Sequence, residues 1–183
     1  MDRNQAYDMV QANVKNKNLV KHMLAVEAVM RALARHLGED EETWALAGLA
    51  HDVDLGKTLD KPRRHAVVGG DMLEEAGAPP EVVQAVRAHN HVLNLPRRSL
   101  LDKALYAADP LTGLIVAAAL IHPAKKLSAI DKEFVLNRFR EKHFARGAGR
   151  NQISSCSELG MSLEDFIALG LEAMQAEARN LGL

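Results

Sequence analysis

The chain has 183 residues, enough for one domain that buries most of its apolar surface without disulfide bonds. Hydrophobic residues make up 48% of the chain but aromatic residues only 4%, so Leu, Ala, Val, Ile and Met must build the core, which favours helices over sheets. A formal net charge of -1 leaves no global basic field, so we expect no nucleic acid polymer as a partner.

Targeting signals are not expected in this sequence. The polar residues 1–5 open directly into a helical pattern, unlike a secretory signal. The most apolar stretch, Leu111 to Ile121, is about half the length needed to cross a bilayer. The single Cys156 cannot pair within the chain, which fits a reducing compartment. We therefore expect a cytoplasmic protein with no membrane partner.

The N-terminal segment predicts two helices. Residues 3–16 have sparse apolar positions, typical of a short amphipathic helix on the surface. Asn18 can cap the next helix, which Gly38 ends. His22 shares the apolar face of this second helix and should point inward. An inward histidine is often a hydrogen-bonded structural residue, but several other histidines here also lie on apolar faces.

The stretch from Gly48 to Lys57 contains an adjacent His51 and Asp52 at the end of an apolar helical run, Trp44 to Ala50. Neighbouring side chains on a helix point about 100° apart, so such a pair serves one purpose only if a third body lies between them. A divalent metal ion is such a body. For the dipeptide alone, a solvated helix end is the more common explanation. Gly56 can supply a left-handed stop.

Further histidines follow on separate helical patterns. A helix from His65 to Leu73 contains Gly69 and Gly70, which indicate either close helix approach or substrate access. In the next helix His89 shares an apolar stripe and points inward. His91 lies about 200° farther round and joins the same site only if the helix ends near Asn90.

Asp109 ends the apolar stripe of a helix that Ser99 can cap. Pro110 could kink this helix and direct the carboxylate inward, or Asp109 could be the N-cap of a new helix over residues 111–121. Beyond these residues we expect a helix from about Ser128, a flexible basic loop over 147–152, and a final helix from about Ser162 to Asn180.

With His22, His51, Asp52 and Asp109 in this order on helical patterns, the chain resembles the HD-domain superfamily of metal-dependent phosphohydrolases. Residues 51–57 are similar to the His-Asp-Ile-Gly-Lys (HDIG) subgroup, with two extra residues before the glycine. The resemblance is to a bacterial branch of that subgroup and covers nearly the whole chain. It also includes similarity to the dinuclear iron enzymes of the superfamily, among them bacterial diadenosine tetraphosphate hydrolases.

The resemblance implies an all-α fold, a helical bundle with additional C-terminal helices. It implies one HD domain over 1–183, with a core at about 18–122 and a helical extension at about 123–183. One divalent ion would be held by the quartet just named. A second would be held at the matching positions His65 and His89, with His91 as an extra ligand or a substitute. Iron is favoured for a dinuclear site, whereas manganese, magnesium or zinc suit a single site.

The predicted reaction is hydrolysis of a phosphate monoester or phosphodiester, of a nucleotide by preference, by a metal-activated water. Asp52 is expected to bridge two metals. Lys57, Arg63 and Arg64 lie between two ligand helices and are predicted to contact the phosphate of a small-molecule substrate, with Lys57 taking part in catalysis. Weaker candidates for phosphate contact are Arg97, Arg98 and Arg150.

Two other functions remain open at this stage. An HD-type di-iron centre can instead activate oxygen, which would make the protein an oxygenase. The chain could also be a nucleotide-binding sensor without turnover. A homo-oligomer is possible under all three hypotheses.

Overall fold

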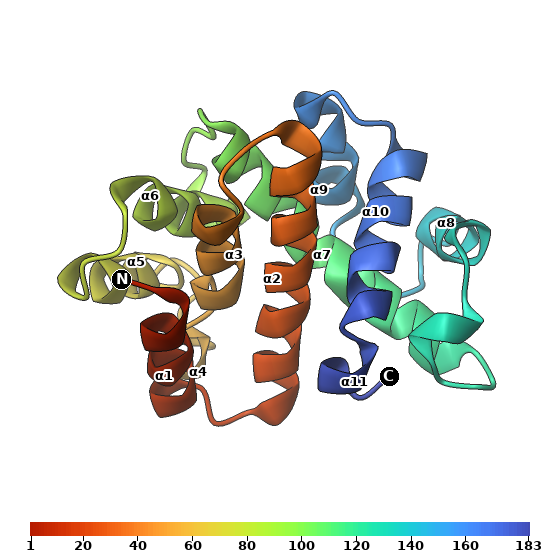
Figure 1. The fold of residues 1–183 in the computed structure, drawn as a ribbon, viewed down its shortest axis with the longest axis horizontal. Coiled ribbons are helices and arrows are strands. Elements are labelled where there is room, and N and C mark those ends of the chain that lie inside the picture. The colour runs from red at the N-terminus through yellow and green to blue at the C-terminus, as the bar shows by residue number, and fades with distance from the viewer.

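Helices form all the regular secondary structure of the computed structural model, which describes residues 1–183, so the all-α prediction is confirmed. Figure 1 shows their arrangement. The α-helices are α1 (Arg3–Asn13), α2 (Lys17–Leu37), α3 (Glu41–Ala50), α4 (Leu55–Thr58), α5 (Val67–Glu75), α6 (Pro80–His89), α7 (Leu100–Ile121), α8 (Lys132–Arg140), α9 (Arg150–Ser154), α10 (Leu163–Ala176) and α11 (Ala178–Leu181). Short 3₁₀ helices are η1 (His91–Leu93), η2 (Leu127–Ala129) and η3 (Ser155–Leu159).

Helices α2 and α3 pack side by side at the centre of the molecule (Figure 1). Their approach depends on Gly48, because a Cβ atom there would lie 2.9 Å from the Cα and N of Glu27 and from the O of Val26. All three atoms belong to the α2 backbone, which cannot move aside as a side chain can. Gly48 therefore fixes the spacing of the two helices that carry His22, His51 and Asp52.

Helix α7 forms the second half of the core and contacts α2, α6 and α10. It is longer than the apolar stretch predicted from the sequence, because Pro110 lies inside one continuous helix rather than at the start of a new one. By length and composition α7 could cross a membrane, but 61% of its apolar window is buried within the structure. Its apolar surface is thus covered by the neighbouring helices.

Several predicted boundaries are wrong. Asn16 caps α2 in place of Asn18. Gly56 does not end a helix in the left-handed region but lies inside α4. His65 precedes α5, whose N-cap Ala66 has a φ of 69°. This strained backbone interrupts the helical pattern, so His65 is placed by a turn.

The C-terminal part also differs from prediction. Helix α8 begins at Lys132, after an Asp131 cap, and not near Ser128. The predicted flexible basic loop instead contains the start of α9, and Arg150 organises it. The Arg150 guanidinium donates hydrogen bonds to six backbone carbonyl oxygens, those of Arg138, Phe139, Glu141, Phe144, Ala145 and Ala148. Arg150 is therefore engaged in holding the chain between α8 and α9.

We expect Gly48→Ala to lower the free energy of unfolding by about 1–3 kcal/mol, because its methyl group overlaps the α2 backbone. The matched control is Gly113→Ala in α7, where nothing lies within 4 Å of the new methyl group. The control should be neutral or more stable by up to about 1 kcal/mol, since alanine favours helix. Urea denaturation measures the free energy of unfolding of both variants. If Gly48→Ala were as stable as Gly113→Ala, the close approach of α2 and α3 at Gly48 would be contradicted.

Candidate metal centre

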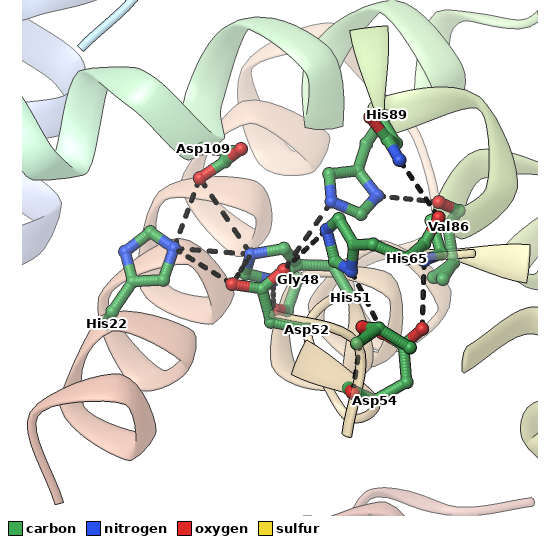
Figure 2. A network of polar contacts seen from close by, with 12 residues as sticks. His22, Gly48, His51, Asp52, Asp54, His65, Val86, His89 and Asp109 are labelled. Atoms are coloured by element: carbon green, nitrogen blue, oxygen red, sulfur yellow. Dashed lines mark hydrogen bonds and ion pairs between the residues drawn. The ribbon is translucent and has the colours of Figure 1, made fainter. Parts of the chain in front are cut away.

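Four histidines and two aspartates from separate parts of the chain converge beside the central helices (Figure 2). They come from α2, from the end of α3, from the turn before α5, from the last residue of α6 and from the middle of α7. Side chains so far apart in sequence meet only because the bundle brings these elements together. The six residues are His22, His51, Asp52, His65, His89 and Asp109.

The buried carboxylate of Asp52 lies between two pairs of imidazoles. Its Oδ2 is 3.4 Å from Nε2 of His51 and 3.8 Å from Nε2 of His22. Its Oδ1 is 3.3 Å from Nε2 of His65 and 3.6 Å from Nε2 of His89. Each oxygen of Asp52 thus faces a different histidine pair, which is the arrangement expected of a bridging carboxylate.

Asp109 completes the His22 side of the cluster. Its Oδ1 is 3.1 Å from Nε2 of His22 and 3.9 Å from Nε2 of His51. Being inside α7, Asp109 is not an N-cap, which settles the alternative left open by the sequence. The side chains of His22 and Asp109 are 24% and 27% exposed, whereas His51 and His89 are buried. Solvent therefore reaches the cluster from the side of His22 and Asp109.

The ring orientations of His51 and His89 are set by their own helices. Nδ1 of His51 lies 2.8 Å from the carbonyl oxygen of Gly48, and Nδ1 of His89 lies 2.6 Å from that of Val86. A carbonyl can only accept, so each Nδ1 carries the proton and donates it. In the neutral ring Nε2 is then left with a free lone pair, directed towards Asp52.

Asp54 orients His65 in the same way. Its buried Oδ1 is 3.1 Å from Nδ1 of His65, and its Oδ2 accepts a hydrogen bond of 2.9 Å from the N–H of Ala66. Gly69 allows this placement, because a Cβ there would lie 3.1 Å from Asp54 Oδ1. Asp54 therefore fixes both the turn before α5 and the tautomer of His65.

Thr112 orients the ring of His22 through its Nδ1. Its hydroxyl oxygen is 3.1 Å from Nδ1 of His22 and donates a hydrogen bond of 2.9 Å to the backbone oxygen of Asp109. The hydroxyl must then accept the proton of His22 Nδ1. Thr112 and Asp54 are the two functional residues that the sequence analysis missed. The sequence did offer an indication of both: Asp54 is one of the two extra residues before Gly56, and Thr112 lies one helical turn after Asp109.

The two carboxylates and the histidines perturb one another strongly without a metal. Burial disfavours the charged form of His51, but Asp52 and Asp109 outweigh it and raise its pKa to about 9. Burial likewise opposes charging of His65, yet Asp52 and Asp54 raise its pKa to about 10. The pKa of Asp52 lies well below its ordinary range, because His51, His65 and His89 offset its desolvation.

The donor set suits a divalent cation. Two groups have ligand atoms within 4.8 Å of one another, one formed by His22, His51 and Asp109 and the other by His51, Asp52 and His89. Neutral imidazole nitrogen and carboxylate oxygen bind zinc, iron and manganese. Metal-ligating histidines normally donate their second ring N–H to a carbonyl or carboxylate, as His51, His65 and His89 do here.

Four residues predicted for the site are not brought into the cluster. His91 is exposed in η1 and lines a separate hollow with Tyr106 and Arg150. Lys57 Nζ donates a hydrogen bond of 2.7 Å to Asn13 Oδ1 on α1. Arg63 and Arg64 are exposed in the turns that follow α4.

The weaker arginine candidates are also engaged elsewhere. The guanidinium of Arg97 stacks over the ring of Tyr106 at 3.8 Å, and the backbone N–H of Arg98 is bonded to Asp102. Arg150 holds backbone carbonyls, as described above. The positions of these residues give no support to a phosphate contact.

The family model described as "HD domain" matches residues 19–120, a range that contains all six clustered residues. The chain belongs to the HD domain family. HD domains are metal-dependent phosphohydrolases that bind divalent metals, which agrees with the donor set described above. The division of this HD protein into a core ending near residue 122 and a helical extension stays a prediction.

Relatives of this HD domain include proteins named Ribonuclease Y. The one from Desulfotalea psychrophila is 35% identical over 140 residues, which cover 74% of this chain and 26% of that protein. The one from Geobacter sulfurreducens is 35% identical over 100 residues, covering 54% of this chain and 18% of that protein. The chain thus spans about a quarter or less of the length of these relatives.

A solved structure has the same fold. It is described as a predicted HD superfamily hydrolase involved in NAD metabolism from Clostridium acetobutylicum. It matches with a TM-score of 0.53 and 21% identity over 99% of this chain and 96% of that chain. The likeness confirms the all-α HD fold along the whole chain.

We expect Asp54→Asn to weaken metal binding at His65 by about 10- to 100-fold, because the amide no longer offers a carboxylate to His65 Nδ1. Metal titration under anaerobic conditions measures this affinity. The matched control, Asp60→Asn, changes an exposed residue in the adjoining loop and should bind metal as the wild type does. Unchanged affinity in both variants would contradict the orienting role of Asp54.

Without metal, stability should fall at alkaline pH. The folded-state pKa values of His51 and His65, about 9 and about 10, exceed the ordinary value of 6.5. Their contribution is complete below about pH 6.5 and is lost as the pH rises through these two values. The urea midpoint of chelator-treated protein should therefore decrease from about pH 7 to about pH 9.5. Added metal should make the urea midpoint less dependent on pH, since imidazoles that bind a metal are already deprotonated. A midpoint that does not change with pH in the absence of metal would contradict the ion pairs of His51 and His65 with the aspartates.

Proposed function

We propose that this HD domain is a metal-dependent phosphohydrolase that uses water to cleave a phosphate ester bond of a nucleotide. The observation that carries the proposal is the orientation of the four imidazoles. Each has its Nδ1 within hydrogen-bond distance of an oxygen atom outside the cluster, so each Nε2 is directed inward and can bind a cation beside Asp52 once it is deprotonated. A merely structural histidine cluster does not require four such tautomers.

The proposal divides the residues between two cation positions. His22, His51 and Asp109 would hold one ion together with Asp52 Oδ2, and His65 and His89 would hold a second with Asp52 Oδ1. Iron is our choice for a filled dinuclear site. When bound, such ions lower the pKa of water towards neutrality and polarise a phosphoryl oxygen.

The protein's own residues contribute orientation and access. Thr112, Asp54 and the helical carbonyls lock the rings, so no side chain has to rotate when the centre fills. Val53 and Ala66, which follow Asp52 and His65 in the sequence, are fully buried. The partly exposed edge at His22 and Asp109 is where a phosphoryl group would arrive.

RNA is the second candidate substrate, because the curated relatives are named Ribonuclease Y. The chain's formal net charge of -1 favours a small nucleotide over a polymer. Of the two alternatives from the sequence, a di-iron oxygenase would consume oxygen, and a sensor without turnover would bind a nucleotide but hydrolyse no phosphate ester bond.

The decisive test is metal analysis of anaerobically purified protein, followed by assays with mononucleotides, dinucleotides and short RNA. We expect His51→Ala to lose bound metal and at least 100-fold in kcat/KM, because its imidazole takes part in both ligand groups. The matched control is His36→Ala, an exposed histidine in the last turn of α2, which should keep both. Retention of metal and activity by His51→Ala would overturn the proposal, and cleavage of RNA without hydrolysis of the mononucleotides or dinucleotides would favour the second candidate.

A further inference from the structure

Two open hollows reach the exposed edge of the metal centre. The basic hollow, about 360 Å³, is lined by His22, Asp109, Pro110, Gly113 and residues 145–148. The apolar hollow, about 470 Å³, has Val116, Leu120, Leu181 and Leu183 in its wall. His22 and Gly113 line both. The two hollows therefore adjoin at a side chain that belongs to the cluster.

Each hollow carries one cation that is not neutralised by the protein. Arg146 lines the basic hollow, is exposed and forms no ion pair; its guanidinium lies 3.5 Å from Nδ1 of His143. Lys21 lines the apolar hollow and also forms no ion pair. Its Nζ lies over Gly182, where a Cβ would be 2.6 Å away. A cation without an ion-pair partner in the same hollow as His22 and Asp109, as Arg146 is, suits an anionic ligand.

Arg146 belongs to a segment whose position is fixed. The Arg150 guanidinium binds the carbonyl oxygens of Phe144, Ala145 and Ala148, on both sides of Arg146. The backbone that presents Arg146 to the hollow is thus held by hydrogen bonds. This differs from Arg63 and Arg64, which line neither hollow.

Gly113 lacks the packing reason that explains the other helical glycines. A Cβ on Gly48, Gly69, Gly70 or Gly170 would meet a neighbour at 2.6 to 3.1 Å, and on Gly56 at 3.4 Å. A Cβ on Gly113 would meet nothing within 4 Å. Glycine weakens a helix relative to alanine. Its presence in the middle of α7, next to Thr112, therefore points to a requirement for open space rather than for close packing.

We propose that Gly113 keeps a passage open between the two hollows, through which one nucleotide-sized phosphate ester spans both. The phosphate would lie in the basic hollow beside His22 and Asp109, in contact with Arg146. The organic group would lie against Val116, Leu120 and Leu181 of the apolar hollow. This inference rests on the proposed function, and it assigns phosphate recognition to Arg146 in place of Lys57, Arg63 and Arg64.

The volumes fit this assignment. Each hollow falls within the range of about 300–1,000 Å³ that is typical of small-molecule sites. An apolar wall with few polar groups suits a nucleobase, and a guanidinium beside metal ligands suits a phosphate. A substrate consisting of phosphate alone would use only the basic hollow.

The test uses manganese-loaded full-length protein and calorimetric titration with AMP and with inorganic phosphate. We expect Gly113→Leu to weaken AMP binding at least tenfold and to leave phosphate binding within twofold, because its side chain fills the passage. Gly113→Ala should fall between wild type and Gly113→Leu. Arg146→Ala should weaken both ligands at least fivefold, whereas the control Arg140→Ala, an exposed arginine outside both hollows, should not.

Metal content and thermal stability of every variant show that the centre and the fold are intact. Unchanged AMP binding in Gly113→Leu, or equal loss of AMP and phosphate, would overturn the passage. Failure of the wild-type protein to bind AMP would overturn it as well. Binding of AMP by a protein that hydrolyses no phosphate ester would instead refute the proposed function while leaving the passage supported.

Discussion

The interaction on which the structure depends is that of the Asp52 carboxylate with the imidazoles around it. A buried charge has a high desolvation cost unless partners surround it. Asp52 meets this condition because both of its oxygens face histidine Nε2 atoms. Since those histidines belong to α2, α3, α6 and the turn before α5, the position of every one of these elements is tied to a single side chain.

The contacts around the cluster determine which nitrogen of each imidazole faces Asp52. Helical carbonyls, Asp54 and Thr112 hold the outer nitrogen of each ring, so that the inner nitrogens all act as possible ligands. An ion entering the centre would find the donors already oriented, with protons on His51 and His65 to displace. The same geometry places the exposed edge at His22 and Asp109, where the two hollows adjoin.

The sequence predicted the helical class and the inward direction of His22 and His89, because periodicity determines which face of a helix is buried. It could not predict the partners of the outer ring nitrogens. Whether Asp54 reaches His65 depends on the left-handed turn at Ala66, which no periodic pattern encodes. The positions of His91 and Lys57 outside the cluster were likewise not encoded in a periodic pattern, since His91 opens the 3₁₀ helix after α6 and Lys57 lies in the four-residue helix α4. Arg150 was misplaced because a basic, glycine-containing segment has the composition of a loop, whereas its order comes from tertiary hydrogen bonds.

The guanidinium of Arg150 also limits how this protein can vary. Six carbonyl oxygens between residues 138 and 148 converge on one planar group, so their spacing along the backbone is fixed by its donors. Surface loops normally tolerate insertions and deletions. Here a change in length would remove several acceptors from reach at once. Homologous proteins that keep this arginine should therefore vary in this segment by side-chain identity, while its number of residues stays constant.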